Sequence, residues 1–283
     1  MRKDTSSIPD FIIVGFMKSG TTTLLHHLRN HRKIHLPANE VHFFDREENF
    51  AKGFDWYQKK VLKNSPEEAM IFGEKTATYS HLDKVAKRIH ENCPQTKIIW
   101  VLRNPVARTY SSYWHDYKQG MELLSFERAI RKEERRIEEN SYYSHKNRSI
   151  YHLQIQRFLE YFPMEQMYFI LFEDMINPYN NDHVLNKLFH FLGTSNEYFE
   201  YSAEVKNKTV LPRYPITLYV GHKLGLINHP KVKNMLLSLN FKNKQPGYRK
   251  MSVETQKELK SYFHQHNKKL EHLINMDLSI WDQ

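Results

Sequence analysis

The chain has 283 residues, of which 40% are hydrophobic and 26% charged, and its one cysteine is Cys93. This length and apolar content suffice for one sizeable core, so we expect a single domain over residues 1–283. A lone cysteine excludes an intramolecular disulfide and a cysteine-rich zinc site. The formal net charge of +10 attracts acidic partners, and polyanionic sugar, nucleotide and nucleic acid all qualify.

No apolar segment of the sequence approaches the length of a membrane span, and the first ten residues lack the apolar centre of a signal peptide. We therefore expect no integral membrane segment and a cytoplasmic location, which the lone cysteine also fits. A Golgi-lumenal or membrane-anchored origin would apply if the chain were cut from a longer precursor.

The first predicted elements are a strand at residues 11–14 and a helix at residues 21–30, joined by a tight loop. The strand is short, β-branched and unalternated, as in a sheet buried on both faces. Gly15 and Gly20 in the loop allow close approach of a ligand, and the helix start favours an anion. The spacing matches the nucleotide-binding pattern G-x-x-x-x-G-K-[ST], except that Thr21 replaces the lysine, which stands instead at Lys18.

Further strands and helices alternate along the chain, which predicts an α/β fold with a central parallel sheet flanked by helices, a P-loop-like nucleotide-binding fold. The run at residues 126–140 mixes both charges and predicts an exposed helix without function. Residues 205–224 give no clear pattern, and residues 241–250 form a basic loop. The remaining expected strands are 71–76, 97–102 and 167–172, and the expected helices are 82–92, one from Pro105, 149–161, 183–192 and 252–273.

Three strings of residues together resemble one family. They are the loop from Lys18 to Thr22, the string ANEVHFFD that ends at Asp45, and the strand end LRNP followed by Arg108 and Ser111. They resemble the sulfotransferases that use 3′-phosphoadenosine 5′-phosphosulfate (PAPS). The resemblance runs from residue 11 to residue 270 and is closest to the carbohydrate branch, which includes the heparan sulfate sulfotransferases.

The resemblance implies two cradles for the cofactor. The loop would hold the 5′-phosphosulfate, with Lys18 stabilising charge on the leaving phosphate oxygen. Arg103 and Ser111 would grip the 3′-phosphate through charge-assisted hydrogen bonds. Cations of the basic C-terminal loop would close over the nucleotide, with Lys244 and Arg249 as our choices among Lys242, Lys244, Arg249 and Lys250. The loop residues implied are Lys18, Ser19, Gly20, Thr21, Thr22 and Thr23.

The resemblance also implies a catalytic group of four residues. Glu40 matches the carboxylate that acts as general base, and Lys75 matches a lysine beside the sulfuryl group. His42 would orient or exchange the proton, and Lys18 completes the group. The residues alone leave other roles open: Glu40 as a loop carboxylate on the surface, His42 as a packed histidine, and Lys75 in a salt bridge to Glu74 or a neighbour.

The predicted function is transfer of a sulfuryl group from PAPS to a hydroxyl or amine of an acceptor. The expected acceptor is a carbohydrate, including a polyanionic one. We expect no metal cofactor and no nucleic acid partner. A P-loop kinase or ATPase is the alternative in the same class, although it should carry a lysine at position 21. A nucleic-acid-binding protein is the alternative outside it, suggested by the net charge and the basic run at residues 241–248. The chain lacks the cysteine hairpin of many heparan sulfate enzymes and the R-K-G-x-x-G string of enzymes acting on phenols and steroids.

Overall fold

The computed structural model describes residues 9–139, 143–195, 210–241 and 249–282. The chain forms two compact units. The first unit is built from residues 1–103 and 151–204, and the second from residues 104–150 and 205–283. The expected single domain over residues 1–283 stays a prediction.

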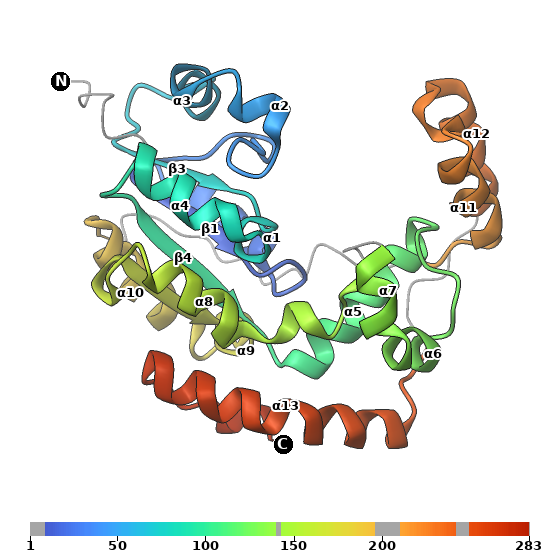
Figure 1. Cartoon of the computed structure of the whole chain (residues 1–283). Coiled ribbons are helices and arrows are strands. Elements are labelled where there is room, and N and C mark those ends of the chain that lie inside the picture. The colour runs from blue at the N-terminus through green and yellow to red at the C-terminus, as the bar shows by residue number, and fades with distance from the viewer. Residues whose placement is uncertain (1–8, 140–142, 196–209, 242–248, 283) are drawn as a thin grey trace. The chain divides into compact units, whose positions relative to one another are not determined.

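The first unit is organised around a five-stranded parallel sheet with the strand order β2-β3-β1-β4-β5 (Figure 1). The central strand β1 is fully buried, because helices cover both faces of the sheet. Ile13 of β1 lies opposite Lys75 of β3 and Ile99 of β4, so these strands end at the same edge. The strands are β1 (Phe11–Gly15), β2 (Ile34–His35), β3 (Ile71–Lys75), β4 (Lys97–Leu102) and β5 (Met167–Leu171).

Helices α1 and α10 supply much of the hydrophobic core of the first unit. Leu24 and Leu28 of α1 and Leu188 of α10 pack in one cluster with Phe11 and Ile13 of β1. The predicted α/β class with a central parallel sheet flanked by helices is confirmed. The helices are α1 (Thr21–Arg29), α2 (Glu47–Phe50), α3 (Phe54–Leu62), α4 (Asp83–Asn92), α8 (Tyr151–Leu159), α9 (Phe172–Ile176) and α10 (Asn181–Leu192), with 3-10 turns Tyr79–His81 and Met164–Gln166.

The second unit is helical in its described residues. Its core joins Val106 and Trp114 of α5 to Phe126 of α6 and to Leu259 and Phe263 of α13. The helices are α5 (Pro105–Lys118), α6 (Phe126–Arg131), α7 (Glu133–Glu139), α11 (Pro215–Lys223), α12 (Pro230–Phe241) and α13 (Val253–Ile274), with 3-10 turns Asn147–Ser149, Leu226–Asn228 and Ser279–Trp281.

Two expectations from the sequence are wrong. The single exposed helix expected at residues 126–140 is two helices, and Phe126, Ala129 and Ile130 are buried because their three- and four-residue spacing puts them on one apolar face. The last expected strand ends at Leu171, and Phe172 already begins α9. Among the helices that the structure describes, none is long and apolar enough to cross a bilayer.

Candidate active site

The loop between β1 and α1 has the backbone geometry of a ligand-binding turn. Lys18 (φ 70°) and Gly20 (φ 95°) both lie in the left-handed region. A Cβ atom at Gly20 would fall 2.3 Å from the ring of Phe172, so only glycine fits this position. The loop therefore brings its backbone close to the start of α1 without side-chain obstruction.

The N-terminus of α1 is suited to an anion. Its first turn carries no acidic residue, and Gly20 supplies no capping side chain, so the helix dipole favours a negative group there. Next to it, the hydroxyl of Ser19 is fully buried and has no hydrogen-bond partner within the described chain. A buried hydroxyl without a partner is costly, and a bound anionic oxygen would satisfy it. These residues fit the 5′ end of the expected nucleotide.

Arg103 braces this loop from the end of β4. Its guanidinium donates to the backbone oxygen of Lys18 (Nη1 to O, 3.0 Å) and lies 4.8 Å from the centre of the Phe172 ring. The backbone oxygen of Arg103 in turn accepts from the hydroxyl of Tyr151 at 2.8 Å. The predicted partner Ser111 lies on α5 in the second unit, where it is buried, and the pairing of Arg103 with Ser111 stays a prediction.

The structure brings together three of the four predicted catalytic residues. The ammonium group of Lys75, at the end of β3, forms an ion pair with the carboxylate of Glu40. Nε2 of His42 lies 3.3 Å from the other oxygen of that carboxylate, and Nδ1 of His42 lies 2.8 Å from Oδ2 of Asp45. Glu40 thus sits between two cationic groups. The alternative of a salt bridge from Lys75 to Glu74 or a neighbour is thus met by the neighbouring Glu40, and not by Glu74.

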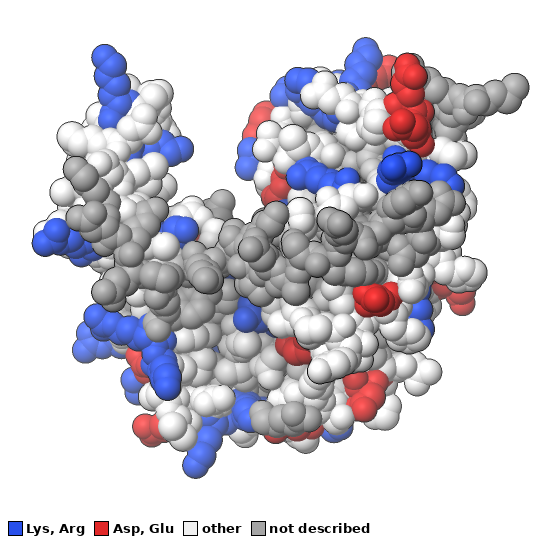
Figure 2. Space-filling view, turned by 180° about the vertical axis from the view of Figure 1, so that it is seen from behind, with Lys and Arg blue, Asp and Glu red and all other residues white. Residues whose placement is uncertain are grey.

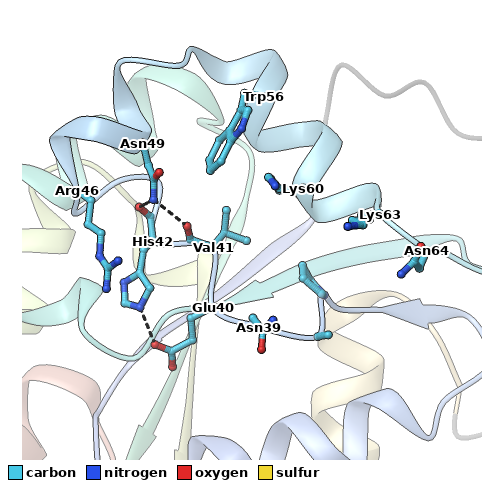
Figure 3. A pocket seen from close by; sticks show the side chains of 12 residues that line it. Asn39, Glu40, Val41, His42, Arg46, Asn49, Trp56, Lys60, Lys63 and Asn64 are labelled. Atoms are coloured by element: carbon cyan, nitrogen blue, oxygen red, sulfur yellow. Dashed lines mark hydrogen bonds and ion pairs between the residues drawn. The ribbon is translucent and has the colours of Figure 1, made fainter. Parts of the chain in front are cut away.

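Asp45 completes this chain of charges but was not assigned a role from the sequence. A carboxylate three residues after a histidine in one short string is a signal that could have found it. The hydroxyl of Thr78 donates to the same carboxylate oxygen at 3.1 Å. Asp45 therefore holds the imidazole of His42 in a fixed orientation, with its Nε2 atom directed at Glu40 (Figure 3).

The contacts among Glu40, His42, Asp45 and Lys75 strongly shift the pKa values of Glu40 and His42. Burial opposes the ionisation of Glu40, but the hydrogen bond with His42 and the charge of Lys75 outweigh it and lower its pKa to about 2. Hydrogen bonds to Asp45 and Glu40 raise the pKa of His42 to about 9. At neutral pH the group therefore holds an ionised Glu40 between an imidazolium and an ammonium.

Glu74, which precedes Lys75 on β3, is a fully buried acidic residue. It accepts hydrogen bonds from Tyr57 (2.6 Å) and Thr76, and burial raises its pKa to about 7. The hydroxyl of Tyr79 lies 3.4 Å from it and accepts from the backbone amides of Phe43 (2.9 Å) and Phe44 (3.3 Å). Glu74 and Tyr79 thus fix the backbone that immediately follows His42. Sequence reasoning missed both.

Glu40 and His42 open into a cavity of about 410 Å³ in the first unit (Figure 3). Trp56 and Lys60 of α3 line the side facing the loop that carries Glu40. Asn49 stabilises the wall, because its side-chain amide donates to the backbone oxygen of His42 at 2.9 Å. The cavity thus offers an aromatic ring, several cations and one carboxylate. Its lining residues are Pro37, Ala38, Asn39, Glu40, Val41, His42, Arg46, Asn49, Trp56, Lys60, Lys63 and Asn64.

The predicted C-terminal cations are only partly within view. Lys242 and Lys244 lie outside the described residues. Arg249 is exposed in the second unit, and its backbone oxygen accepts from the hydroxyl of Tyr110. Its predicted contact with a nucleotide stays a prediction.

Comparisons with known proteins show the family of this chain. The model of the family described as "Sulfotransferase domain" matches residues 8–211. Heparan sulfate glucosamine 3-O-sulfotransferase 5 of Mus musculus is 32% identical over 167 residues, which cover 58% of this chain and 47% of the relative. Heparan sulfate glucosamine 3-O-sulfotransferase 6 of Homo sapiens is 32% identical over 169 residues, covering 60% and 48%. The aligned residues thus span about half the length of these curated relatives.

One solved structure is similar over almost the whole chain. The sulfotransferase from Alicyclobacillus acidocaldarius superposes with a TM-score of 0.72 at 26% identity, covering 97% of this chain and 99% of that one. This likeness supports the parallel-sheet fold described above. None of the comparisons supports the expected cytoplasmic location.

Proposed function

Because the chain belongs to the sulfotransferase domain family, we propose that it transfers a sulfuryl group from PAPS to a hydroxyl or amine of a carbohydrate. The observation that carries this proposal is the group of Lys75, Glu40 and His42, of which Glu40 and His42 line a cavity. Strands β1 and β3 are neighbours and end at the same edge of the sheet, so the anion-binding loop and Lys75 share that edge.

The donor supplies an activated sulfuryl group whose leaving group is a phosphate. The proposal assigns its 5′ end to the buried hydroxyl of Ser19, the first-turn amides and the hydroxyls of Thr21, Thr22 and Thr23. Lys18 neutralises charge that grows on the leaving oxygen. Arg103 is assigned to the 3′-phosphate together with Ser111, and Lys244 and Arg249 are proposed to cover the nucleotide.

Glu40 takes the proton from the attacking oxygen in this proposal. The acceptor oxygen bonds to sulfur, the bond from sulfur to the phosphate oxygen breaks, and the proton passes to the carboxylate of Glu40. A pKa near 2 makes Glu40 a weak base while Lys75 is paired with it. A shift of the Lys75 ammonium toward the sulfuryl oxygens would weaken that pairing and raise the basicity of Glu40. Asp45 keeps His42 aligned on Glu40.

A carbohydrate acceptor is supported by the lining of the cavity. Trp56 offers an apolar ring surface, and Arg46, Lys60 and Lys63 are cations that suit acidic groups of a sugar. The two relatives described above are named for glucosamine in heparan sulfate. We therefore propose a glucosamine-containing, acidic polysaccharide as the first acceptor to test.

Isothermal titration with 3′-phosphoadenosine 5′-phosphate, compared with ADP and magnesium, tests the donor site. The bisphosphate should bind the wild type tightly, bind Arg103→Ala at least about tenfold more weakly because a charge-assisted hydrogen bond is lost, and bind Glu40→Gln unchanged. Tighter binding of ADP with magnesium would replace the proposal with phosphoryl transfer.

Turnover of radiolabelled PAPS with N-sulfated, uronate-containing polysaccharide tests the acceptor site. Glu40→Gln should lose at least about a hundredfold in kcat while keeping its affinity for the bisphosphate, because a general base contributes that much or more. Full activity of Glu40→Gln would remove Glu40 from the chemistry.

A further inference from the structure

Helices α11 and α12 of the second unit form an antiparallel hairpin. The side-chain amide of Asn240 donates to the hydroxyl of Thr217 at 3.0 Å. Gly221 lies four residues after Thr217 on α11, and Leu236 lies four residues before Asn240 on α12. These two residues are also in contact, because the Cδ1 atom of Leu236 would lie 2.8 Å from a Cβ atom at Gly221. These two contacts define the sides on which the helices face each other.

One side of this hairpin is apolar and exposed. In α11, Ile216 and Val220 come one position before Thr217 and Gly221, which face α12. In α12, Met235 and Leu239 come one position before Leu236 and Asn240, which face α11. Successive residues of an α-helix are rotated by about 100° around its axis. In two antiparallel helices, the residues one position before the facing residues therefore lie on the same side of the pair. Leu224 continues the stripe of α11. These five side chains, here called the hairpin face, are between 44% and 67% exposed.

The opposite side of the hairpin is the one that packs on its own unit. Leu218 follows Thr217 by one position and is buried, and its Cβ atom would lie 2.4 Å from a Cβ at Gly120. The hairpin face therefore points away from this packing contact. Half of the strongly exposed large hydrophobic residues in the described chain fall within residues 214–239, which singles out this segment.

The charge of the hairpin has one sign. Residues 210–241 contain Arg213, Lys223, Lys231 and Lys233 and no aspartate or glutamate. In Figure 2 the visible side of this hairpin carries blue side chains and no red ones. A second copy of the same face would bring like charges together, whereas an anionic surface would be attracted.

We propose that the hairpin face binds the surface of an anionic lipid bilayer. Exposed aliphatic side chains flanked by lysines are the pattern of helices that lie in the interface of a membrane. The hairpin face holds aliphatic side chains and a methionine and no aromatic anchor, and a lipid surface, unlike a protein partner, requires no matching shape. Each nearby lysine adds attraction to acidic headgroups. This inference is independent of the proposed transferase activity.

Flotation of the full chain with lipid vesicles tests the proposal. The wild type should float with vesicles of phosphatidylcholine and phosphatidylserine and stay in solution with phosphatidylcholine alone, and salt should weaken the binding. Leu224→Glu and Ile216→Glu should each lower the partition coefficient by about tenfold or more, the scale of burying one large apolar side chain. Lys231→Gln should lower it about fivefold.

Val253→Glu is the matched control, because Val253 is 68% exposed, lies in the same unit outside the hairpin and receives the same new charge. It should change the partition coefficient far less than Leu224→Glu. Equal loss in the two variants would reduce the effect to net charge and overturn the assignment to the hairpin face. Failure of the wild type to float would also overturn it, as would a dimer that Leu224→Glu dissociates while vesicle binding is absent. An unchanged far-ultraviolet circular dichroism spectrum of every variant verifies folding.

Discussion

At the scale of single residues, the site depends on side chains whose charge is set by their neighbours. Glu40, His42 and Asp45 lie in one short loop, and Lys75 reaches them from β3. Their residue types could be read from the sequence, because the string around Glu40 resembles that of the carbohydrate sulfotransferases. Their mutual contacts could not, since Lys75 is distant in sequence and its partner could as well have been Glu74.

His42 is expected to be protonated at neutral pH. Its two carboxylate partners raise its pKa to about 9 from an ordinary 6.5, so its pairing stabilises the fold fully below pH 6.5 and that contribution is lost as the pH rises to about 9. An NMR titration of the imidazole should give a midpoint near 9, and Asp45→Asn should lower it because the first partner loses its charge. A midpoint near 6.5 in the wild type would contradict the geometry.

Glu74 should make the free energy of unfolding depend on pH at lower pH than His42 does, between pH 4.5 and 7. Burial raises its pKa to about 7 from an ordinary 4.5, so its protonated form stabilises the fold below pH 4.5 and this contribution is lost between pH 4.5 and 7. Over that window the free energy of unfolding should fall by about 3 kcal/mol on account of this group. Urea unfolding of Glu74→Gln should show a smaller fall, and Glu134→Gln, at an exposed glutamate of the second unit, is the control.

At the scale of elements, the ends of β1 and β3 bring the loop of Ser19 and Lys75 to one edge of the sheet. Tyr79 holds the loop that follows β2, because its hydroxyl accepts hydrogen bonds from two backbone amides of that loop, those of Phe43 and Phe44. The strands and the first helix follow from apolar runs and glycine spacing. The contact of Tyr79 with this loop joins residues far apart in sequence, and no local pattern encodes it.

Tyr79→Phe and Tyr57→Phe form a matched pair that tests this support. Each removes one hydroxyl beside Glu74, but only Tyr79 also binds the amides of Phe43 and Phe44. Tyr79→Phe should lower kcat by about tenfold, because losing hydrogen bonds of about 1 kcal/mol each displaces Glu40. Its affinity for the bisphosphate should not change. If Tyr57→Phe lowers kcat equally, the loop amides are not what matters.

At the scale of the whole molecule, the net charge of +10 suits an acidic acceptor and an acidic cofactor. The family match and the solved relative confirm the resemblance to sulfotransferases that the sequence strings indicated. The buried face of α6 was not expected, because mixed charge concealed it. The apolar face of the α11 and α12 hairpin was not expected either, because no helix was predicted in residues 215–241.

Turnover is expected to continue when a chelator is present. In the proposed function, Lys18, Lys75 and Arg103 supply the positive charge that a metal would otherwise bring to the phosphates and the sulfuryl group. Thr21 replaces the lysine of the magnesium-dependent loop pattern. The radiolabel assay with and without EDTA should give rates within about twofold, a difference of under 1 kcal/mol in barrier. Complete loss on adding EDTA, restored by magnesium, would show that these cations do not suffice.

The sequence by itself determined the fold class and indicated the family, because these depend on the local spacing of apolar residues, glycines and charged groups. The roles it assigns to the loop after β1 and to Glu40, His42 and Lys75 stay predictions. Only the tertiary structure decided that Lys75 and His42 both contact the carboxylate of Glu40 and that Glu74 and Tyr79 support the loop. It also decided that the hydroxyl of Ser19 is buried and has no hydrogen-bond partner among the described residues. These contacts join distant segments, and their energies come from burial and mutual charge, which exist only after the chain has folded.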